Sequence, residues 1–148
     1  MSMDLSRRAI NNLWPLLLAG SWEAEAAATD PLPSACYPFE SLPVSVNKAT
    51  HAESRQVFKG VTHEGVSIDM HITTMPPGQM PHAPHHHVHE ETMMIKEGKL
   101  EVTIAGKTTV VGPGSVIYVL SNEEHGLKSV GDVAAQYFVL AIGKQTKS

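Results

Sequence analysis

The sequence HAPHHHVHEETMMIKEG, from His82 to Gly98, concentrates the metal-binding chemistry of this chain. Five of the nine histidines lie in its first eight positions, and two glutamates and an apolar run follow them directly. Neutral imidazole is the commonest side-chain ligand of transition metals, and a neighbouring carboxylate suits iron, manganese, zinc or nickel. The stretch therefore predicts a metal site.

Alternation along an extended chain indicates which of these side chains act together. His85, His87 and Glu91 share one face of such a chain, and His89 has the same parity. A fourth ligand must come from elsewhere in the sequence. The histidines outside the stretch are His51, His63, His71 and His125. His125 is the one that follows directly after a second strand-like run.

The stretch resembles the first motif of the cupins, in which H-x-H is followed by three or four residues, a glutamate, six residues and a glycine. The matching residues are His85, His87, Glu91 and Gly98. The glycine that leads the motif corresponds to Gly78, which lies one residue further from the first histidine than is usual.

A second cupin motif, G-x5-P-x-G-x2-H-x3-N, keeps its spacing here with three changes of identity. Its positions fall on Gly114, Leu120, Asn122, His125 and Ser129. Asn122 can adopt the left-handed conformation that a turn glycine supplies, so this exchange is mild. Leu120 and Ser129 replace a proline and an asparagine and make the second motif the weaker of the two.

The resemblance covers residues 67–142 and implies a jelly-roll barrel that binds one divalent transition metal. The ligands that it implies are His85, His87, Glu91 and His125. The other three histidines of the stretch, His82, His86 and His89, are expected to lie outside the ligand set. A solvated histidine-rich loop that chelates metal adventitiously is the alternative.

Three neutral imidazoles and one carboxylate leave a divalent ion positively charged, with about two open positions in an octahedral shell. Such an ion acts as a Lewis acid, or holds substrate beside dioxygen if it is iron. Glu91 could also leave the metal and serve as a catalytic base. Met93 and Ile95 share its parity and are expected to point into the barrel, so the metal would lie at one end of an apolar pocket. The alternative is that these side chains simply fill the barrel.

Cupin enzymes include dioxygenases, isomerases, decarboxylases and lyases. The leading interpretation is a metal-dependent enzyme, most plausibly an oxygenase that acts on a small apolar or phenolic compound. The second is a non-catalytic cupin that binds a small ligand or senses metal. A reachable cavity beside the metal would separate them, because the fold alone does not.

Composition excludes several other classes of protein. The 148 residues suit one domain, and their net charge of −4 has no basic block that favours a nucleic-acid partner. Cys36 is the only cysteine, which excludes an intramolecular disulfide and a cysteine zinc site. The sequence has no H-E-x-x-H, no G-x-S-x-G and no phosphate-binding loop.

Residues 1–28 resemble a twin-arginine export signal, which would place the protein in the periplasm or outside the cell; without a signal it would be cytoplasmic. Arg7 and Arg8 precede an apolar run from Leu13 to Ala19 and a small-residue stretch that suits cleavage. The rival is an amphipathic helix, which Pro15 would bend. We favour the signal. No run approaches the about 20 apolar residues of a membrane span.

Residues 29–43 form a proline-rich arm, and residues 44–148 are assigned to the barrel. Pro31, Pro33, Pro38 and Pro43 fix extended backbone, so no helix is expected in the arm. An arm of this kind is expected to lie across a domain or a neighbouring subunit and to bury Tyr37, Phe39 and Leu42. A free linker is the alternative. Because cupin barrels are often dimers, the resemblance also implies a homodimer.

The barrel region consists of short strand signals separated by glycine and proline. The expected strands are residues 44–47, 56–59, 66–75, 91–96, 99–104, 108–111, 115–120, 125–129 and 133–142. With no helical pattern among them, the chain is expected to be all-β, a single-domain jelly roll.

Overall fold

The computed structural model describes residues 30–143 of the chain. Nine strands account for most of them. In chain order they are β1 (Val44–Val46), β2 (Glu53–Val61), β3 (Ser67–Met75), β4 (Glu90–Glu97), β5 (Lys99–Ile104), β6 (Lys107–Val111), β7 (Val116–Val119), β8 (His125–Val130) and β9 (Ala135–Ile142). The described residues contain one short 3-10 helix, η1 (Phe39–Ser41).

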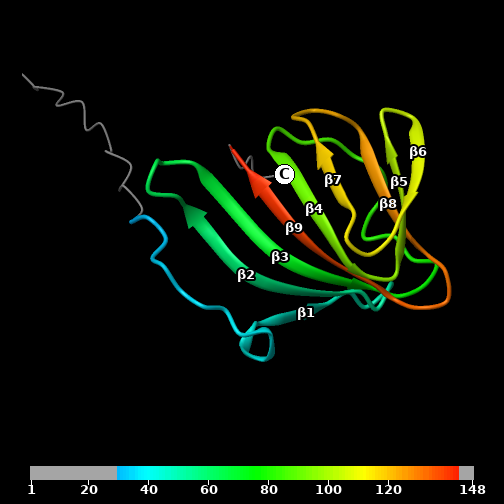
Figure 1. The fold of residues 1–148 in the computed structure, drawn as a ribbon, viewed down its shortest axis with the longest axis horizontal. Helices are drawn as coiled ribbons and strands as arrows, with labels where there is room; N and C mark the ends of the chain where they lie inside the picture. Colours follow the sequence, from blue (N-terminus) through cyan, green and yellow to red (C-terminus); the bar gives the residue numbers. More distant parts are fainter. Residues whose placement is uncertain (1–29, 144–148) are drawn as a thin grey trace, which may run out of the picture.

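The strands form two antiparallel sheets, as the all-β jelly-roll expectation requires. The larger sheet has the order β1-β2-β3-β9-β4-β7 and the smaller sheet has the order β6-β5-β8. Figure 1 shows the smaller sheet facing the β4–β7 end of the larger one, while β2 and β3 extend away from it. Strands distant in sequence thus become neighbours, and β9 lies between β3 and β4.

The core lies between the sheets and follows the alternation of the strands. Along β9, Ala135, Tyr137, Val139 and Ala141 are buried and alternate with half-buried residues. Met93 and Ile95 of β4 are 1% and 3% exposed and belong to the same apolar cluster. Their expected inward orientation is therefore confirmed.

Each expected strand is present, and the largest error is the length of β2. Only residues 56–59 were expected to be extended, whereas β2 runs from Glu53 to Val61 and pairs with β3 along its length. The register shifts between Gln56 and Phe58, which marks a bulge. Many side chains of β2 are polar, so the strand has no apolar alternation that predicts its full length. Its backbone can still pair with β3, because backbone pairing does not require apolar residues.

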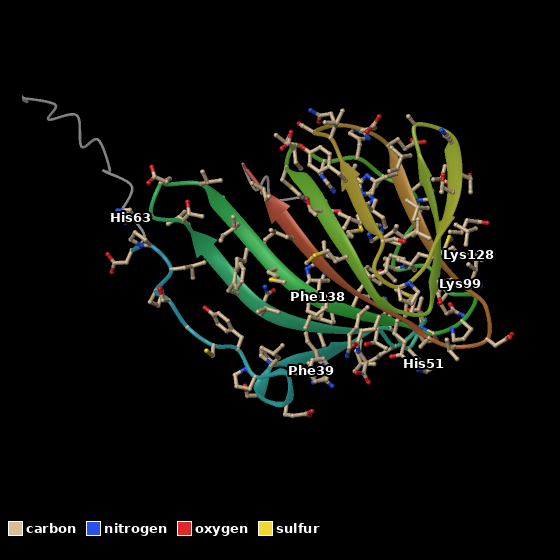
Figure 2. The ribbon with its side chains drawn as sticks, viewed as in Figure 1. Phe39, His51, His63, Lys99, Lys128 and Phe138 are labelled. Atoms are coloured by element: carbon tan, nitrogen blue, oxygen red, sulfur yellow. The ribbon has the colours of Figure 1, made fainter. Side chains whose placement is uncertain are left out.

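The proline-rich arm lies against β2 of its own sheet. The Leu32 amide donates a hydrogen bond to the Val61 carbonyl oxygen over 2.9 Å. Further along the arm, the Tyr37 ring lies 5.6 Å from the Phe58 ring, and the Arg55 guanidinium lies 4.6 Å above the Phe39 ring, labelled in Figure 2. The arm thus runs antiparallel to β2.

Two of the three side chains expected to be buried by the arm are covered. Leu42 is 7% exposed and Phe39 is half-buried, whereas Tyr37 is 38% exposed. The 3-10 turn at Phe39–Ser41 was not expected, and it is closed by the hydrogen bond from the Ser41 amide to the Pro38 carbonyl oxygen. Proline at that position keeps its carbonyl acceptor, so it permits the turn.

The export signal and its helical rival fall on residues 1–28, which lie outside the described residues. Between residues 30 and 143, no helix has the length and apolar character needed to cross a membrane.

Candidate metal centre

Backbone hydrogen bonds hold the two motifs together. The His85 amide donates to the His125 carbonyl oxygen over 3.0 Å, and the His125 amide donates back to His85 over 2.9 Å. The Asn122 amide donates to the His87 carbonyl oxygen over 2.7 Å. The segment before β4 is thus fixed against the start of β8, and side chains far apart in sequence meet.

The residues that replace family glycines and the glycines that remain fit this arrangement. Asn122 has a φ of 61°, so the expected left-handed conformation is confirmed. Gly78, at the start of the first motif, has a φ of 76° and donates its amide hydrogen to the Ser129 carbonyl oxygen over 2.9 Å. The exchanged Ser129 thus still joins the two motifs through its backbone.

The four side chains assigned as ligands lie together. The ring centroid of His85 is 5.1 Å from that of His87 and 4.7 Å from that of His125, and the last two are 4.9 Å apart. Glu91 Oε1 lies 3.4 Å from His87 Nε2, and Glu91 Oε2 lies 3.6 Å from His125 Nε2. We call these four residues the His/Glu cluster.

Two imidazoles of the cluster are oriented by backbone carbonyls. His87 Nδ1 lies 2.8 Å from the His89 carbonyl oxygen, and His125 Nδ1 lies 3.0 Å from that of Glu123. A carbonyl only accepts hydrogen bonds, so each Nδ1 carries a proton, and in the neutral imidazole each Nε2 has the lone pair that can bind a metal. His87 Nε2 is buried and has no hydrogen-bond partner. A lone pair held in this way fits a metal ligand.

The electrostatics of the cluster favour an ionised carboxylate. Burial alone would raise the pKa of the Glu91 carboxyl, but the neighbouring imidazoles of His125 and His87 outweigh burial and lower the pKa to about 2. Glu91 is therefore a carboxylate at neutral pH, the form that binds metal.

The pKa values of His85 and His125 are shifted in opposite directions. Burial and the neighbouring His82 and His125 lower the pKa of His85 to about 4, so this imidazole is neutral at physiological pH. The nearby Glu91 carboxylate raises the pKa of His125 above its ordinary value. A metal that binds His125 must therefore displace a proton that Glu91 stabilises.

His89 was expected outside the ligand set, yet it lies against the cluster. Its ring stacks on that of His87 with centroids 3.6 Å apart, and its Nε2 lies 3.2 Å from Glu91 Oε1. Two overlapping sets of possible ligand atoms result. One contains His85, His87 and His125, and the other contains His87, His89 and Glu91. The sequence contained one signal that His89 would lie near Glu91, because both residues have the same parity along an extended chain.

The remaining two histidines of the stretch lie apart from the carboxylate. The His82 ring is 4.0 Å from that of His85 at a steep angle, and His86 is exposed. His86 therefore provides a matched control for the neighbouring His87.

A cavity of about 370 Å³ adjoins the cluster, with Glu91 and His125 among its lining residues. Met93 lines it as expected, but one wall is polar and carries His71, Thr73 and Tyr137. The sequence analysis missed this wall. Alternation along β3 was the available signal, because His71 and Thr73 share one face with the buried Met75.

Comparison with known proteins agrees with this architecture. Residues 71–142 match the family model of the cupin domain. No curated protein is significantly similar to the sequence. Among solved structures, an RmlC-like cupin from Shewanella frigidimarina is 16% identical with a TM-score of 0.62, and the match covers 76% of this chain and 94% of that one.

Two further structures are similar at the level of the fold. The polyketide cyclase RemF from Streptomyces resistomycificus is 16% identical with a TM-score of 0.61, covering 78% of this chain and 88% of that one. A sugar phosphate isomerase of the cupin superfamily from Silicibacter pomeroyi is 13% identical with a TM-score of 0.61, covering 75% and 76%. The matched domain and the shared fold place this chain in the cupin superfamily.

Proposed function

We propose that this protein is a metal-dependent cupin enzyme that binds one divalent transition metal, Fe, Mn, Zn or Ni, through His85, His87, Glu91 and His125. The observation that carries the proposal is the buried Nε2 of His87, which has no hydrogen-bond partner although two other imidazoles and a carboxylate surround it. An unpaired buried nitrogen costs about 1–3 kcal/mol, and a metal ion would remove this cost.

The residues of the site divide the work between binding and proton transfer. A bound divalent ion would supply Lewis-acid chemistry, or redox chemistry with dioxygen if it is iron. The three imidazoles would hold the ion, and the Glu91 carboxylate would lower its net charge. Glu91 also lines the cavity, so it can accept a proton from a bound substrate when it leaves the metal.

We propose an oxygenase that acts on a small apolar or phenolic compound as the reaction class. Support comes from the apolar side of the cavity, where Met75, Met93, Leu127 and Val139 exclude water from bound substrate. The cavity favours a protein that acts on or binds a small compound over a metal sensor, because a metal sensor needs no space of this size.

The test compares full-length wild type with His87→Ala and His86→Ala, each freed of metal and reloaded with iron(II), manganese(II), zinc(II) or nickel(II). We expect one metal per chain in wild type and in His86→Ala, and less than one tenth of this occupancy in His87→Ala. Equal occupancy in the two variants would remove the assigned site. Oxygen consumption by the iron-loaded protein with a panel of phenols then tests the oxygenase assignment, and no consumption would contradict it.

We also propose that the protein is a homodimer. Apolar side chains are exposed on the outer face of β4 and β7, where Met94, Val116 and Tyr118 are 45%, 62% and 51% exposed. Surfaces of this kind are commonly covered in an assembly. Light scattering coupled to size-exclusion chromatography should give twice the mass of one chain, and a monomer at all concentrations would contradict this.

A further inference from the structure

The charge of the cavity restricts what it can bind. Within the described part of the chain, no residue that lines the cavity is a lysine or an arginine. Its carboxylates are Glu53 and Glu91, and a divalent ion at the His/Glu cluster would be the only fixed positive charge. Phosphate esters are normally held by arginine or lysine side chains, and burying their double charge without such partners is costly.

The polar wall of the cavity provides a second place where a ligand can be held. Thr73 and Tyr137 face each other across β3 and β9 and are 7% and 1% exposed. Both side chains belong to residues that line the cavity. Two hydroxyl groups are thus available beside the apolar Met75 and Val139, and together they can donate to and accept from one oxygen atom of a ligand.

This pair shares its cavity with the metal-binding residues. The charge of Glu91 reaches both the Tyr137 hydroxyl and the imidazole of His71. Burial raises the pKa of Tyr137, so its hydroxyl keeps the proton at neutral pH and remains a hydrogen-bond donor. Between the pair and the cluster lie Met93 and Val139, which suit an apolar ligand body.

We propose that the cavity binds an uncharged or singly negative organic compound with an oxygen group at each end, and that it rejects phosphate esters. One oxygen group faces the metal bound by the His/Glu cluster, and the other is held by Thr73 and Tyr137. This inference rests on the proposed metal site and names the class of substrate for it. Tyr137 is therefore a specificity-determining residue.

The experiment measures binding to the zinc-loaded full chain by calorimetry, since zinc excludes redox turnover. The probes are 4-hydroxybenzoate and 4-hydroxycinnamate, each compared with its partner that lacks the hydroxyl, benzoate or cinnamate. The two lengths allow for the unknown span of the natural ligand. We expect the hydroxyl to tighten binding about 3- to 10-fold in at least one pair, the value of one neutral hydrogen bond. We expect no binding of 4-carboxyphenyl phosphate.

Variants assign this gain to the polar wall. Tyr137→Phe should reduce the ratio of affinities within the pair to about one. Thr73→Val should also lower this ratio, and it provides the test if Tyr137→Phe does not fold. The control Tyr118→Phe removes an exposed hydroxyl on the outer face and should leave the ratio unchanged. All folded variants should bind one zinc ion per chain.

The outcomes separate this inference from the proposed function. A chain that binds zinc but shows no hydroxyl-dependent gain, a gain that survives Tyr137→Phe, or tight binding of the phosphate ester overturns the inference and leaves the metal site intact. A wild-type chain that binds no zinc overturns both.

Discussion

Gly98, the last residue of the first motif, is required by its surroundings in two ways. Its φ of 73° lies in the left-handed region that other residues rarely adopt. A Cβ atom at this position would lie 2.5 Å from the Ala134 carbonyl oxygen and 2.7 Å from the Ala135 Cα atom. The close approach of β9 to the turn between β4 and β5 therefore excludes a side chain.

Gly98→Ala should destabilise the protein more than Gly65→Ala. Gly65 has a similar φ of 78°, but no atom lies within 4 Å of the position of its missing Cβ. The control should lose about 1–2 kcal/mol through left-handed strain alone, and Gly98→Ala should lose about 1–3 kcal/mol more through overpacking. Urea unfolding of both variants measures the difference, and equal losses would contradict the close approach.

His89 is the residue whose role the sequence motifs do not assign. Its contact with Glu91 Oε1 suggests that it orients the carboxylate while the metal takes the free oxygen. His89→Ala should therefore weaken zinc binding about 10- to 100-fold without abolishing it, whereas the exposed His86→Ala should have no effect. Competition with a chromophoric chelator measures both affinities.

Complete loss of zinc from His89→Ala would make His89 a ligand, and an unchanged affinity would remove its positioning role. His89→Gln should recover part of the lost affinity, because its amide can still donate to the carboxylate.

Local sequence patterns predicted the position of every strand, but they did not predict which strands pair with one another. Glycine precedes β5, separates β5 from β6 and follows β8, and alternation predicted the inward face of β4. The length of β2 depends on pairing with β3, which no local pattern records. The position of Thr73 opposite Tyr137 depends on the pairing of β3 with β9, so the proximity of these two residues could not be predicted from either strand alone.

The candidate site was more accessible to sequence analysis because motif spacing carries long-range information. His85, His87 and Glu91 precede or begin β4, and the matching interval to His125 placed a fourth residue at the start of β8. The backbone pairing of His85 with His125 is the physical basis of this interval. The contact of His89 with Glu91 is a matter of side-chain rotation, which spacing does not determine.

The segment before β4 and the start of β8 both supply histidines to the cluster. Because several of these ligands take up protons, the metal should dissociate cooperatively as the pH falls. Metal binding requires neutral imidazoles, and Glu91 raises the pKa of His125, so protons compete with metal at this residue at a higher pH than at an ordinary histidine. Metal occupancy should fall as the pH drops through about 6.5, with more than one proton taken up per metal released. Equilibrium dialysis across this range measures the slope, and a metal that remains bound at pH about 4 would indicate another site.

At the scale of the whole molecule, the export proposal concerns residues outside the described structure. Removal of residues 1–26 would take away Asp4, Glu23 and Glu25 against Arg7 and Arg8, a net charge of −1, so the mature charge becomes −4 + 1 = −3. The exported chain would also lose both of its tryptophans, Trp14 and Trp22. Mass spectrometry of protein from the native host should find a chain that begins near Ala27, and an intact chain outside the cytoplasm would contradict a cleaved signal.

The two overlapping sets of side chains would place a metal ion at different positions, so the position of the ion shows which residues bind it. A crystal structure of the metal-loaded chain, with the ion located by its anomalous scattering, measures the ligand distances directly. We predict one ion about 2.0–2.3 Å from a nitrogen of each of His85, His87 and His125 and from an oxygen of Glu91. His89 should lie outside this range. An ion held by His87, His89 and Glu91, with His85 and His125 beyond bonding distance, would contradict this prediction.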